Sequence, residues 1–446
     1  MKKLTESTYE DRFLYKKHDL KGYLIGLSSS KHLNSHSLKE KINYIVKKML
    51  QPLSFFGNFL VGRVIYRESA SIYNGIRPEL LFICCYSIQH RSFKILGNII
   101  NNSSNQGNIL IITDKVDVYE YFSSKRIKCI LYEIRGLIFD KFINTAPNVS
   151  SEEFFVLSKV KKKIDFTDMI FDKFLPKVVF TTCDLHIYER VFTQEGINRG
   201  VVTVTHQHGQ MSPNNNILKY TISDYLVAWG VGTKNNFKNI FERTKIKVFG
   251  TDIYTELINE KNKHGKEYIT IALNPRSDEI NKYLISQVCK QINKINVADL
   301  MKYKLILKLH PEMKLKFWKK VFFETVKQNK LKIKFDCFSG NNHIIINKTK
   351  ILVVLSSSIT LEAFMCDVPV VALDIPQIYN NPFVYFKRLE GSIVNIENLS
   401  EKIEKILTDR EYSRDFIYKQ RLALNHEVSY FDSSVRELKW VNNFVK

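Results

Sequence analysis

The chain is built from short, continuously apolar segments, each followed by about ten residues whose apolar positions have helical spacing. Buried parallel strands have this composition, because helices cover both faces of their sheet. The pattern therefore predicts repeated βα units on parallel sheets. In the first half the expected strands are LLFICCYSI (80–88), NILIIT (108–113), IKCILYEI (127–134), KVVFTTC (177–183), GVVTVTHQHG (200–209) and SDYLVAW (223–229).

The same alternation continues after a charged stretch without a strand, YTELINEKNKHGKE (254–267). The predicted fold class is α/β, with two doubly wound, Rossmann-like domains that face each other across a cleft. We expect an N-terminal arm over residues 1–36, a first domain over 37–255 and a second over 256–446. The second-half strands are expected in YITIALNP (268–275), KLILKLHP (304–311), ILVVL (351–355) and VPVVALD (368–374), with helices over 278–292, 316–329 and 358–366.

The composition fits a folded protein of a reducing compartment. The 446 residues suit two domains, and 30 Phe and 22 Tyr can fill sizeable cores. Seven scattered cysteines without a CxxC pair favour neither disulfides nor zinc. The N-terminus has early lysines but no apolar segment behind them, and no run approaches the roughly 18 apolar residues of a membrane span. We expect a soluble, cytoplasmic protein.

The net charge of +22 has two explanations: the protein binds an anionic partner, or its lysines are spread over a solvated surface. Anionic substrates, an anionic membrane surface and nucleic acid all fit the sign of the charge. The lysines are dispersed, and KVKKK (159–163) is their densest run, without the interleaved aromatic residues of a nucleic-acid site. We therefore expect no nucleic-acid partner, and consider peripheral contact with the anionic inner face of a membrane.

Several predicted strands end in small polar or imidazole side chains, where open parallel sheets bind their ligands. In SSSITLEA, Ser356, Ser357 and Ser358 precede a helix, whose free N–H groups and dipole favour a diphosphate or phosphodiester. Glu362 follows one turn later and is expected to face the same ligand, for instance a ribose. The alternative is that a serine serves only as the helix N-cap.

The segment LKLHPEM ends another strand with His310 and Pro311. Proline cannot continue the ladder of hydrogen bonds, so the imidazole is expected to project from the sheet edge. There it can donate a hydrogen bond to a phosphate or to a leaving group. A histidine in an ordinary surface turn is the alternative.

The segment HQHG (206–209) places His206 and His208 on one side of a strand, with Gln207 between them. Gly209 allows a tight turn or the close approach of a ligand. No third ligand with suitable spacing follows, so we expect no metal there. His208 is the predicted general base or hydrogen-bonding group of an acceptor site, to which Gln207 and Gly209 also belong.

A further strand end, TTCDLHIYE, contributes Asp184, His186 and Glu189. Asp184 is the alternative candidate for a catalytic base, although a helix N-cap explains an aspartate there equally well. GxGxxG, GxxxxGK[ST] and GxSxG are all absent. The sequence therefore gives no motif evidence for a dinucleotide oxidoreductase, a P-loop kinase or an α/β-hydrolase.

Four segments occur in an order that resembles bacterial surface-polysaccharide glycosyltransferases of GT-B architecture: QHG (207–209), DYLVAWG (224–230), KLHP (308–311) and SSSITLEAFMCDVPVV (356–371). The likeness covers about residues 176–375. The HP and serine pair looks most like CMP-sugar-dependent sialyl-, polysialyl- and Kdo-transferases. CDP-glycerol phosphotransferases share much of the pattern, and non-hydrolysing nucleotide-sugar epimerases resemble its C-terminal end.

The resemblance implies an inverting, metal-independent glycosyltransferase of capsule or lipopolysaccharide synthesis. It would move an acidic sugar from a CMP donor to a glycan or glycolipid acceptor, with no cofactor beyond the nucleotide-sugar substrate. The first domain would bind the acceptor and the second the donor, whose phosphate would contact His310 and the serines. The acidic D/E-D/E-G triplet of sialyltransferases is absent from the first domain, so His208, or Asp184 in reserve, would act as base.

Three alternatives stay open at this point. The chain also fits a CDP-glycerol glycerophosphotransferase or a nucleotide-sugar 2-epimerase, which share parts of the motif pattern. A non-catalytic polysaccharide- or nucleic-acid-binding protein is the alternative of another class. An epimerase would turn over its donor without an acceptor, and a nucleic-acid binder would show a steep dependence on salt.

Overall fold

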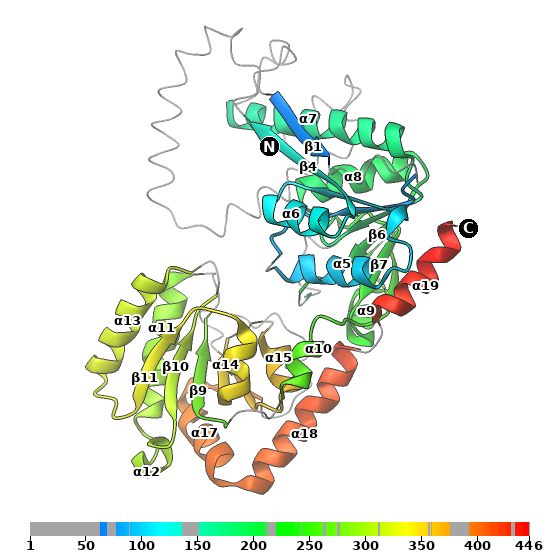
Figure 1. The fold of residues 1–446 in the computed structure, drawn as a ribbon. Coiled ribbons are helices and arrows are strands. Elements are labelled where there is room, and N and C mark those ends of the chain that lie inside the picture. The colour runs from blue at the N-terminus through cyan, green and yellow to red at the C-terminus, as the bar shows by residue number, and fades with distance from the viewer. Residues whose placement is uncertain are drawn as a thin grey trace.

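A computed structural model describes residues 63–68, 77–88, 90–135, 151–209, 211, 220–241, 243–261, 265–273, 277–310, 313–355, 357, 359–374, 392–429 and 433–445. The arm expected over 1–36 and a helix expected over 37–50 lie outside these residues. The described chain forms two α/β domains, each built on one sheet (Figure 1).

The first sheet has the strand order β1-β4-β3-β2-β5-β6-β7-β8. All neighbouring pairs are parallel except β1 with β4 at one edge. Its inner strands are buried on both faces, as their apolar sequences require. The strands are β1 (Arg63–Glu68), β2 (Leu80–Ile83), β3 (Ile109–Thr113), β4 (Lys128–Arg135), β5 (Val178–Thr181), β6 (Val202–His206), β7 (Tyr225–Ala228) and β8 (Lys245–Val248).

The helices of the first domain follow these strands and cover the sheet. α5 illustrates why they form: His90 caps its first turn by accepting from Ser92 N, and Phe93, Leu96 and Ile99 are buried on one side. The helices are α5 (Arg91–Asn102), α6 (Val116–Ser124), α7 (Ser151–Phe174), α8 (Ile187–Asn198) and α9 (Val231–Phe237), with a 3₁₀ turn, η3 (Gln106–Asn108).

The second sheet is entirely parallel, in the order β11-β10-β9-β12-β13-β14. Its strands are β9 (Tyr268–Ala272), β10 (Lys304–Lys308), β11 (Lys334–Phe338), β12 (Thr349–Val354), β13 (Val370–Asp374) and β14 (Ile393–Asn395). Its helices are α10 (Thr255–Asn259), α11 (Asp278–Ile292), α12 (Val297–Leu300), α13 (Leu315–Gln328), α14 (Asn342–Lys348), α15 (Ile359–Met365), η6 (Ile396–Asn398), α17 (Leu399–Thr408) and α18 (Arg410–Glu427).

Both sheets reverse their strand order at one point, between β2 and β5 in the first and between β9 and β12 in the second. The second sheet has the order 3-2-1-4-5-6 of dinucleotide-binding domains. The prediction of two doubly wound, Rossmann-like domains is therefore confirmed. Ligands of such sheets bind beyond the carboxyl ends of the strands at the point of reversal, so these two points locate the candidate site.

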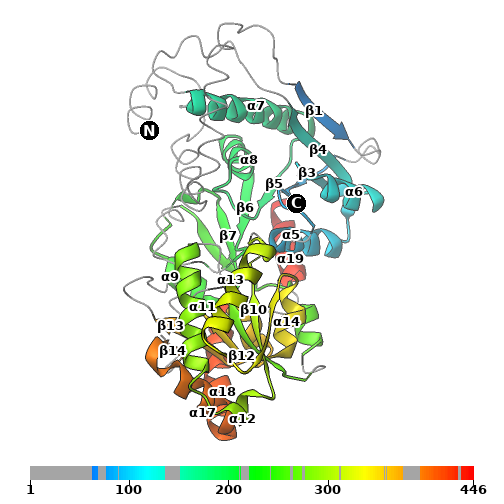
Figure 2. The same ribbon diagram turned by 90° about the vertical axis from the view of Figure 1, so that its left-hand side faces the viewer.

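The C-terminal helix α19 (Ser433–Val445) packs on the first domain, against α5 and β5 (Figures 1 and 2). The division of the chain expected from sequence assigned these residues to the second domain. The apolar residues Leu438 and Val441 explain the difference, since both are buried in the cluster that includes α5. Asp252 accepts hydrogen bonds from Ser433 N and Ser434 N, both at 2.9 Å, and so caps α19.

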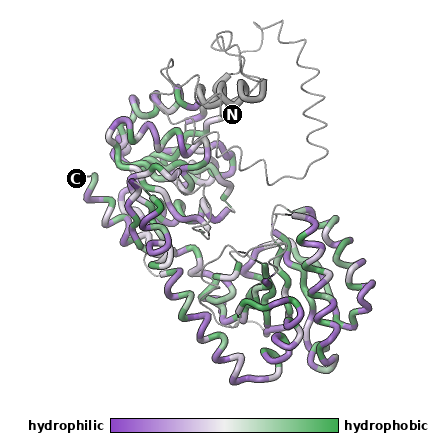
Figure 3. The backbone as a smooth tube through the Cα atoms, turned by 180° about the vertical axis from the view of Figure 1, so that it is seen from behind, coloured by the Kyte–Doolittle hydropathy of each residue, from purple (hydrophilic) through white to green (hydrophobic). Residues whose placement is uncertain are grey.

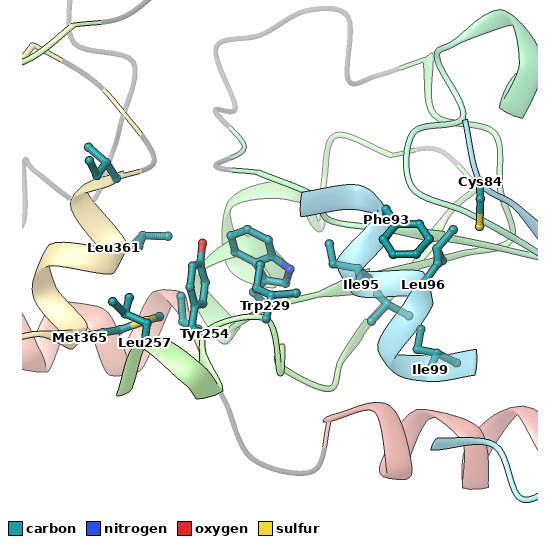
Figure 4. Packing of buried hydrophobic residues seen from close by; sticks show 14 of the residues in the cluster. Cys84, Phe93, Ile95, Leu96, Ile99, Trp229, Tyr254, Leu257, Leu361 and Met365 are labelled. Atoms are coloured by element: carbon teal, nitrogen blue, oxygen red, sulfur yellow. The ribbon is translucent and has the colours of Figure 1, made fainter. Parts of the chain in front are cut away.

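One hydrophobic cluster extends across the domain interface (Figure 4). Trp229 and Tyr254 lie between Ile95 of α5 and the α15 residues Leu361 and Met365. Elsewhere the apolar residues concentrate on the strands of both sheets, and the outer helices alternate in polarity (Figure 3). Within the described residues, no helix combines the length and the apolar composition that a membrane span needs.

Candidate functional site

The carboxyl ends of β2, β5 and β6 in the first domain meet those of β10 and β12 in the second. The contact is closest between Arg91, at the start of α5, and Glu362 of α15, where Arg91 Nη2 lies 2.5 Å from Glu362 Oε1. The Arg91 guanidinium carbon also lies 5.8 Å from the centre of the Trp229 ring and 5.6 Å from that of Tyr254. The ion pair therefore joins the two domains, and the two cation–π contacts hold the guanidinium in place.

This ion pair is largely removed from water. Glu362 is 2% exposed, and its second oxygen, Oε2, is buried without a hydrogen-bond partner. Burial lowers the pKa of Arg91, but Tyr254 and Glu362 outweigh it and raise that pKa overall. Lys308, buried at the end of β10, also faces the negative charge of Glu362. The interface thus combines two cations with a carboxylate oxygen that is free to accept a hydrogen bond.

His208 lies just beyond the end of β6 with one ring nitrogen fixed. Its Nδ1 is 2.7 Å from the carbonyl oxygen of Thr182, and because a carbonyl only accepts, Nδ1 carries the proton. Nε2 is then the basic nitrogen. Burial lowers the pKa of His208 to about 4, aided by His186, His90 and Arg91 and opposed by the bond to Thr182. The imidazole is therefore neutral near pH 7, as a general base must be.

An aromatic cluster surrounds His208. The Tyr86 ring stacks on His90 at 4.4 Å between centroids, and lies 5.8 Å from His186 and 6.5 Å from His208. His90 Nδ1 accepts from Ser92 N at 3.1 Å, so its neutral ring carries the proton on Nε2. Burial, Arg91, His186 and His310 lower the pKa of His90 to about 4. Through Nε2, the neutral His90 is therefore a hydrogen-bond donor and the neutral His208 is an acceptor.

Tyr86, His90 and Arg91 were not among the residues proposed from sequence. They follow β2, at the point where the first sheet reverses its strand order. The signal was present in the segment CCYSIQHRS, which places polar side chains directly after an apolar run, as the other strand ends do. The strand expected over 80–88 included Tyr86, but β2 ends at Ile83, so the polar residues that follow the strand were not recognised as a strand end.

The donor-side residues are described only in part. His310 follows β10, is partly buried, and contributes to the lowered pKa of His90, which places the two imidazoles near each other. Ser357 is partly buried, and its carbonyl oxygen accepts from Thr360 N in the first turn of α15. Pro311, Ser356 and Ser358 lie outside the described residues. The predicted roles of these five residues stay predictions.

Asp184 supports a loop of the first domain. Its Oδ2 accepts from Ile222 N at 2.8 Å, Ser223 N at 2.9 Å and Ser223 Oγ at 2.6 Å. It is not the N-cap of α8 either, because that helix begins at Ile187 with His186 in the cap position. The same oxygen thus accepts from three donors of residues 222 and 223 and holds that loop in place. These contacts give Asp184 a structural role in the first domain, and the assignment of the base to His208 or Asp184 stays a prediction.

Gln207 and Gly209 flank His208 in different ways. Gln207 is buried, and its Oε1 accepts from Trp229 N at 2.9 Å and from Thr233 Oγ1 at 3.0 Å, which links the end of β6 to the junction of β7 and α9. A methyl group built on Gly209 would meet no described atom within 4 Å. The protein itself therefore does not require glycine at 209, and the space there is open.

Two further buried groups hold these strand ends in place. His206 contacts the Thr181 carbonyl at 3.0 Å and Glu437 of α19 at 2.5 Å. Glu189 Oε1 accepts from Thr182 N, Thr182 Oγ1 and Cys183 N, while its Oε2 is buried without a partner. Burial raises the pKa of Glu189 to about 8 despite these three bonds. Among the described residues, no three His, Cys, Asp or Glu side chains are grouped as a metal site would require.

Comparison with solved structures identifies the fold. The chain is similar to sucrose-phosphate synthase from Thermosynechococcus elongatus, with 12% identity, 83% of this chain and 99% of that chain covered, and a TM-score of 0.52. It is also similar to UDP-GlcNAc 2-epimerase from Neisseria meningitidis bound to UDP-GlcNAc, with 13% identity, 82% of this chain and 99% of that chain covered, and a TM-score of 0.51. The chain is similar as well to UDP-GlcNAc 2-epimerase from Methanocaldococcus jannaschii. The identity is 16%, 82% of this chain and 99% of that chain are covered, and the TM-score is 0.50.

No protein-family model and no curated protein matches the sequence. The likeness to solved structures nevertheless extends over both domains and over almost the full length of each neighbour. At these identities it establishes the fold, which is the GT-B arrangement of two Rossmann-like domains expected from the sequence motifs.

Proposed function

We propose that the protein is a nucleotide-sugar-dependent glycosyltransferase that transfers a sugar to a hydroxyl group of a glycan or glycolipid. The fold supports this proposal, because the structural neighbours include a sucrose-phosphate synthase and an epimerase determined with UDP-GlcNAc bound. The observation that carries it is His208, a neutral imidazole whose tautomer is fixed by the Thr182 carbonyl and whose Nε2 is basic.

In this proposal His208 Nε2 accepts the proton of the acceptor hydroxyl as its oxygen attacks the anomeric carbon of the donor. The bond from that carbon to the phosphate oxygen breaks, and its electron pair leaves with the nucleotide phosphate. A single displacement inverts the anomeric carbon and forms no covalent intermediate with the protein. His90, with its proton on Nε2, is suited to donate a hydrogen bond to the acceptor or to the sugar.

On the donor side, Arg91 and Lys308 supply positive charge next to Glu362. Such charges stabilise a departing phosphate without a metal ion. His310 and the serines 356–358 are the proposed phosphate contacts, and the open Oε2 of Glu362 is the proposed partner of a ribose hydroxyl. The finer assignment is an acidic sugar on a CMP donor and a capsule or lipopolysaccharide acceptor. It rests on the resemblance of QHG, KLHP and SSSITLEA to CMP-sugar-dependent transferases.

A nucleotide-sugar 2-epimerase is the second candidate, and the epimerases among the structural neighbours favour it. The two activities differ in their need for an acceptor. Purified protein would be incubated with CMP- and UDP-sugars, first alone and then with a glycan acceptor, and the sugar and nucleotide products would be measured. Nucleotide release that depends on the acceptor supports the transferase, whereas conversion of the sugar without an acceptor supports the epimerase.

The nucleotide would be identified by thermal stabilisation with CMP, CDP, UMP and UDP. Larger shifts with the cytidine nucleotides support a CMP or CDP donor. Equal shifts for all four would remove the argument for cytidine and leave the transferase proposal untouched. The absence of stabilisation by any nucleotide would contradict both enzymatic candidates.

A further inference from the structure

The surface that includes α13 is strongly basic. Residues 314–334 contain eight lysines and a single acidic residue, Glu324; the lysines are Lys314, Lys316, Lys319, Lys320, Lys327, Lys330, Lys332 and Lys334. By contrast, residues 399–427, which form α17 and α18, contain six lysines and arginines and six acidic residues. Residues 314–334 thus carry an excess of seven positive charges, whereas the charges of residues 399–427 balance.

Within the part of the chain that the structure describes, few of these lysines are neutralised. Lys334 is exposed on β11, an edge strand. Among the described carboxylates, the one within 4 Å of a lysine of this set is Glu324, at 3.9 Å from Lys320. Both side chains of this pair are well exposed, so the contact contributes little. The surface keeps nearly its whole positive charge.

Apolar side chains lie among these lysines. Leu315 is 43% exposed, Phe317 is 41% and Phe323 is 38%, although Trp318 and Phe322 already bury the inner side of α13. The nitrogen of Lys282 lies 5.6 Å from the centre of the Phe317 ring, and that of Lys319 lies 5.4 Å from Phe323. The outer side of α13 thus combines phenyl rings with ammonium groups.

We propose that this α13 surface, formed by residues 314–334, binds the headgroup region of an anionic lipid bilayer. Lysines near such a bilayer are attracted to its surface charge, and aromatic residues enter the interface between headgroups and acyl chains. A soluble polyanion would account for the lysines but would leave the exposed rings without a function. The combination favours a bilayer.

The position of α13 fits this partner. The helix follows β10, whose end carries His310, and it lies on the outer side of the second domain (Figures 1 and 2). The binding itself does not depend on the proposed reaction and is measured without substrate.

The test uses the full chain and flotation with vesicles of phosphatidylcholine, with or without 30% phosphatidylglycerol. Binding is expected only to the anionic vesicles. Each lysine near such a surface is worth about 1 kcal/mol, or roughly fivefold in affinity. The variant Lys316→Gln/Lys320→Gln/Lys327→Gln should therefore bind roughly 100-fold more weakly.

A matched control removes the same charge elsewhere. The variant Arg410→Gln/Arg414→Gln/Lys419→Gln changes three exposed cations of α18, and it should bind the anionic vesicles within about threefold of the unchanged protein. Equal losses in the two triple variants would assign the binding to net charge alone and overturn the proposal. So would failure of the unchanged protein to float with the anionic vesicles.

The exposed ring distinguishes a bilayer from a soluble polyanion. Phe317→Ser should weaken vesicle binding several-fold, most clearly in high salt, where the lysine contribution is screened. Its affinity for soluble polyphosphate should not change. Unchanged vesicle binding by this variant, together with polyphosphate binding as tight as vesicle binding, would assign the surface to a soluble polyanion and overturn the proposal. Circular dichroism would confirm that each variant is folded.

Discussion

Arg91 of the first domain and Glu362 of the second form a buried ion pair, although 271 residues separate them in the sequence. The pair occupies one oxygen of the carboxylate and leaves the other without a partner. Because Glu362 is also the proposed ribose contact, domain association and nucleotide binding share one carboxylate. Changes in this pair should therefore affect both stability and donor affinity.

Removal of Arg91 should destabilise the protein more than removal of both partners. Arg91→Met removes the ion-pair partner of the buried Glu362 carboxylate, and breaking a buried pair in this way typically costs about 3–5 kcal/mol. The double variant Arg91→Met/Glu362→Gln should recover part of this loss, because no uncompensated charge remains. Urea denaturation of the two single variants and the double variant gives the coupling energy. Strictly additive losses would show that the ion pair is not a stabilising contact.

His208→Ala should abolish or strongly reduce transfer and leave donor-induced thermal stabilisation intact, because a base that removes the acceptor proton contributes little to donor binding. The loss expected for a general base is about 100- to 10,000-fold. The comparison is Asp184→Asn, which weakens the bonds to residues 222 and 223 and should lower stability by about 1–3 kcal/mol. An inactive but stable Asp184→Asn, with His208→Ala still active, would move the role of base to Asp184.

The dependence of transfer on pH should differ from that of an ordinary histidine. His208 has a pKa near 4 in the folded protein, so Nε2 stays unprotonated well below pH 6.5. The transfer rate per folded molecule should be flat from pH 8 to about 5.5, where a base of pKa 6.5 would lose roughly nine-tenths of its activity. A rate that is halved near pH 6.5 would contradict the assignment.

The stability of the folded protein should fall as the pH is lowered from about 6.5 toward 4. The folded pKa values of His208 and His90 lie below those of free histidine. Their contribution to stability is therefore complete above about pH 6.5 and is lost as the pH falls toward 4, because the unfolded chain binds the protons first. The fraction of folded protein must accordingly be measured by circular dichroism at each pH of the rate profile.

Local sequence was sufficient to predict the inner strands and most helices of the two domains. The helix expected over 278–292 coincides with α11, because Ser277 caps it and its apolar positions have helical spacing. β1, β8 and β14 were missed. β8 is a short edge strand with the exposed residues Lys245 and Lys247, and so it lacks the continuous apolar run by which the other strands were identified.

The sequence predicted only those site residues that can be recognised from the segment at the end of one strand. The segment HQHG indicated His208, but the contact that fixes its tautomer comes from Thr182, 26 residues away. The two hydrogen bonds that Asp184 accepts from main-chain nitrogens come from residues 38 and 39 positions away. Such contacts cannot be predicted from a short motif. Long-range contacts of this kind decide which polar residue at a strand end is free to act on a substrate.

His90 offers a test of a residue that the sequence analysis missed. Asparagine is a good N-cap, so His90→Asn should keep the cap of α5 and change stability by less than about 1 kcal/mol. It removes the imidazole that stacks on Tyr86, and transfer should fall at least tenfold. His90→Ala should lose both the cap and the activity. If the Asn variant is as active as the unchanged protein, His90 serves only to cap the helix.

Glu189 connects the buried interior of the first domain to His208. Its Oε1 binds the main-chain nitrogens of Thr182 and Cys183, and the Thr182 carbonyl in turn fixes His208. Glu189→Gln keeps an acceptor at Oε1, so transfer should persist. Glu189→Ala removes that acceptor, and transfer should fall with the loss of the His208 orientation. Comparable activity in the two variants would separate Glu189 from the site.

The stability of the unchanged protein and that of Glu189→Gln should depend differently on pH. Burial raises the folded pKa of Glu189 to about 8, far above its value in an unfolded chain. Between about pH 4.5 and 8 the folded state binds more protons than the unfolded state, so this group lowers stability as the pH rises. Glu189→Gln does not titrate and should gain on the unchanged protein by roughly 2–5 kcal/mol between pH 5 and 9. Urea denaturation at both pH values measures the difference, and a constant gap would mean that Glu189 is ionised in the folded protein throughout.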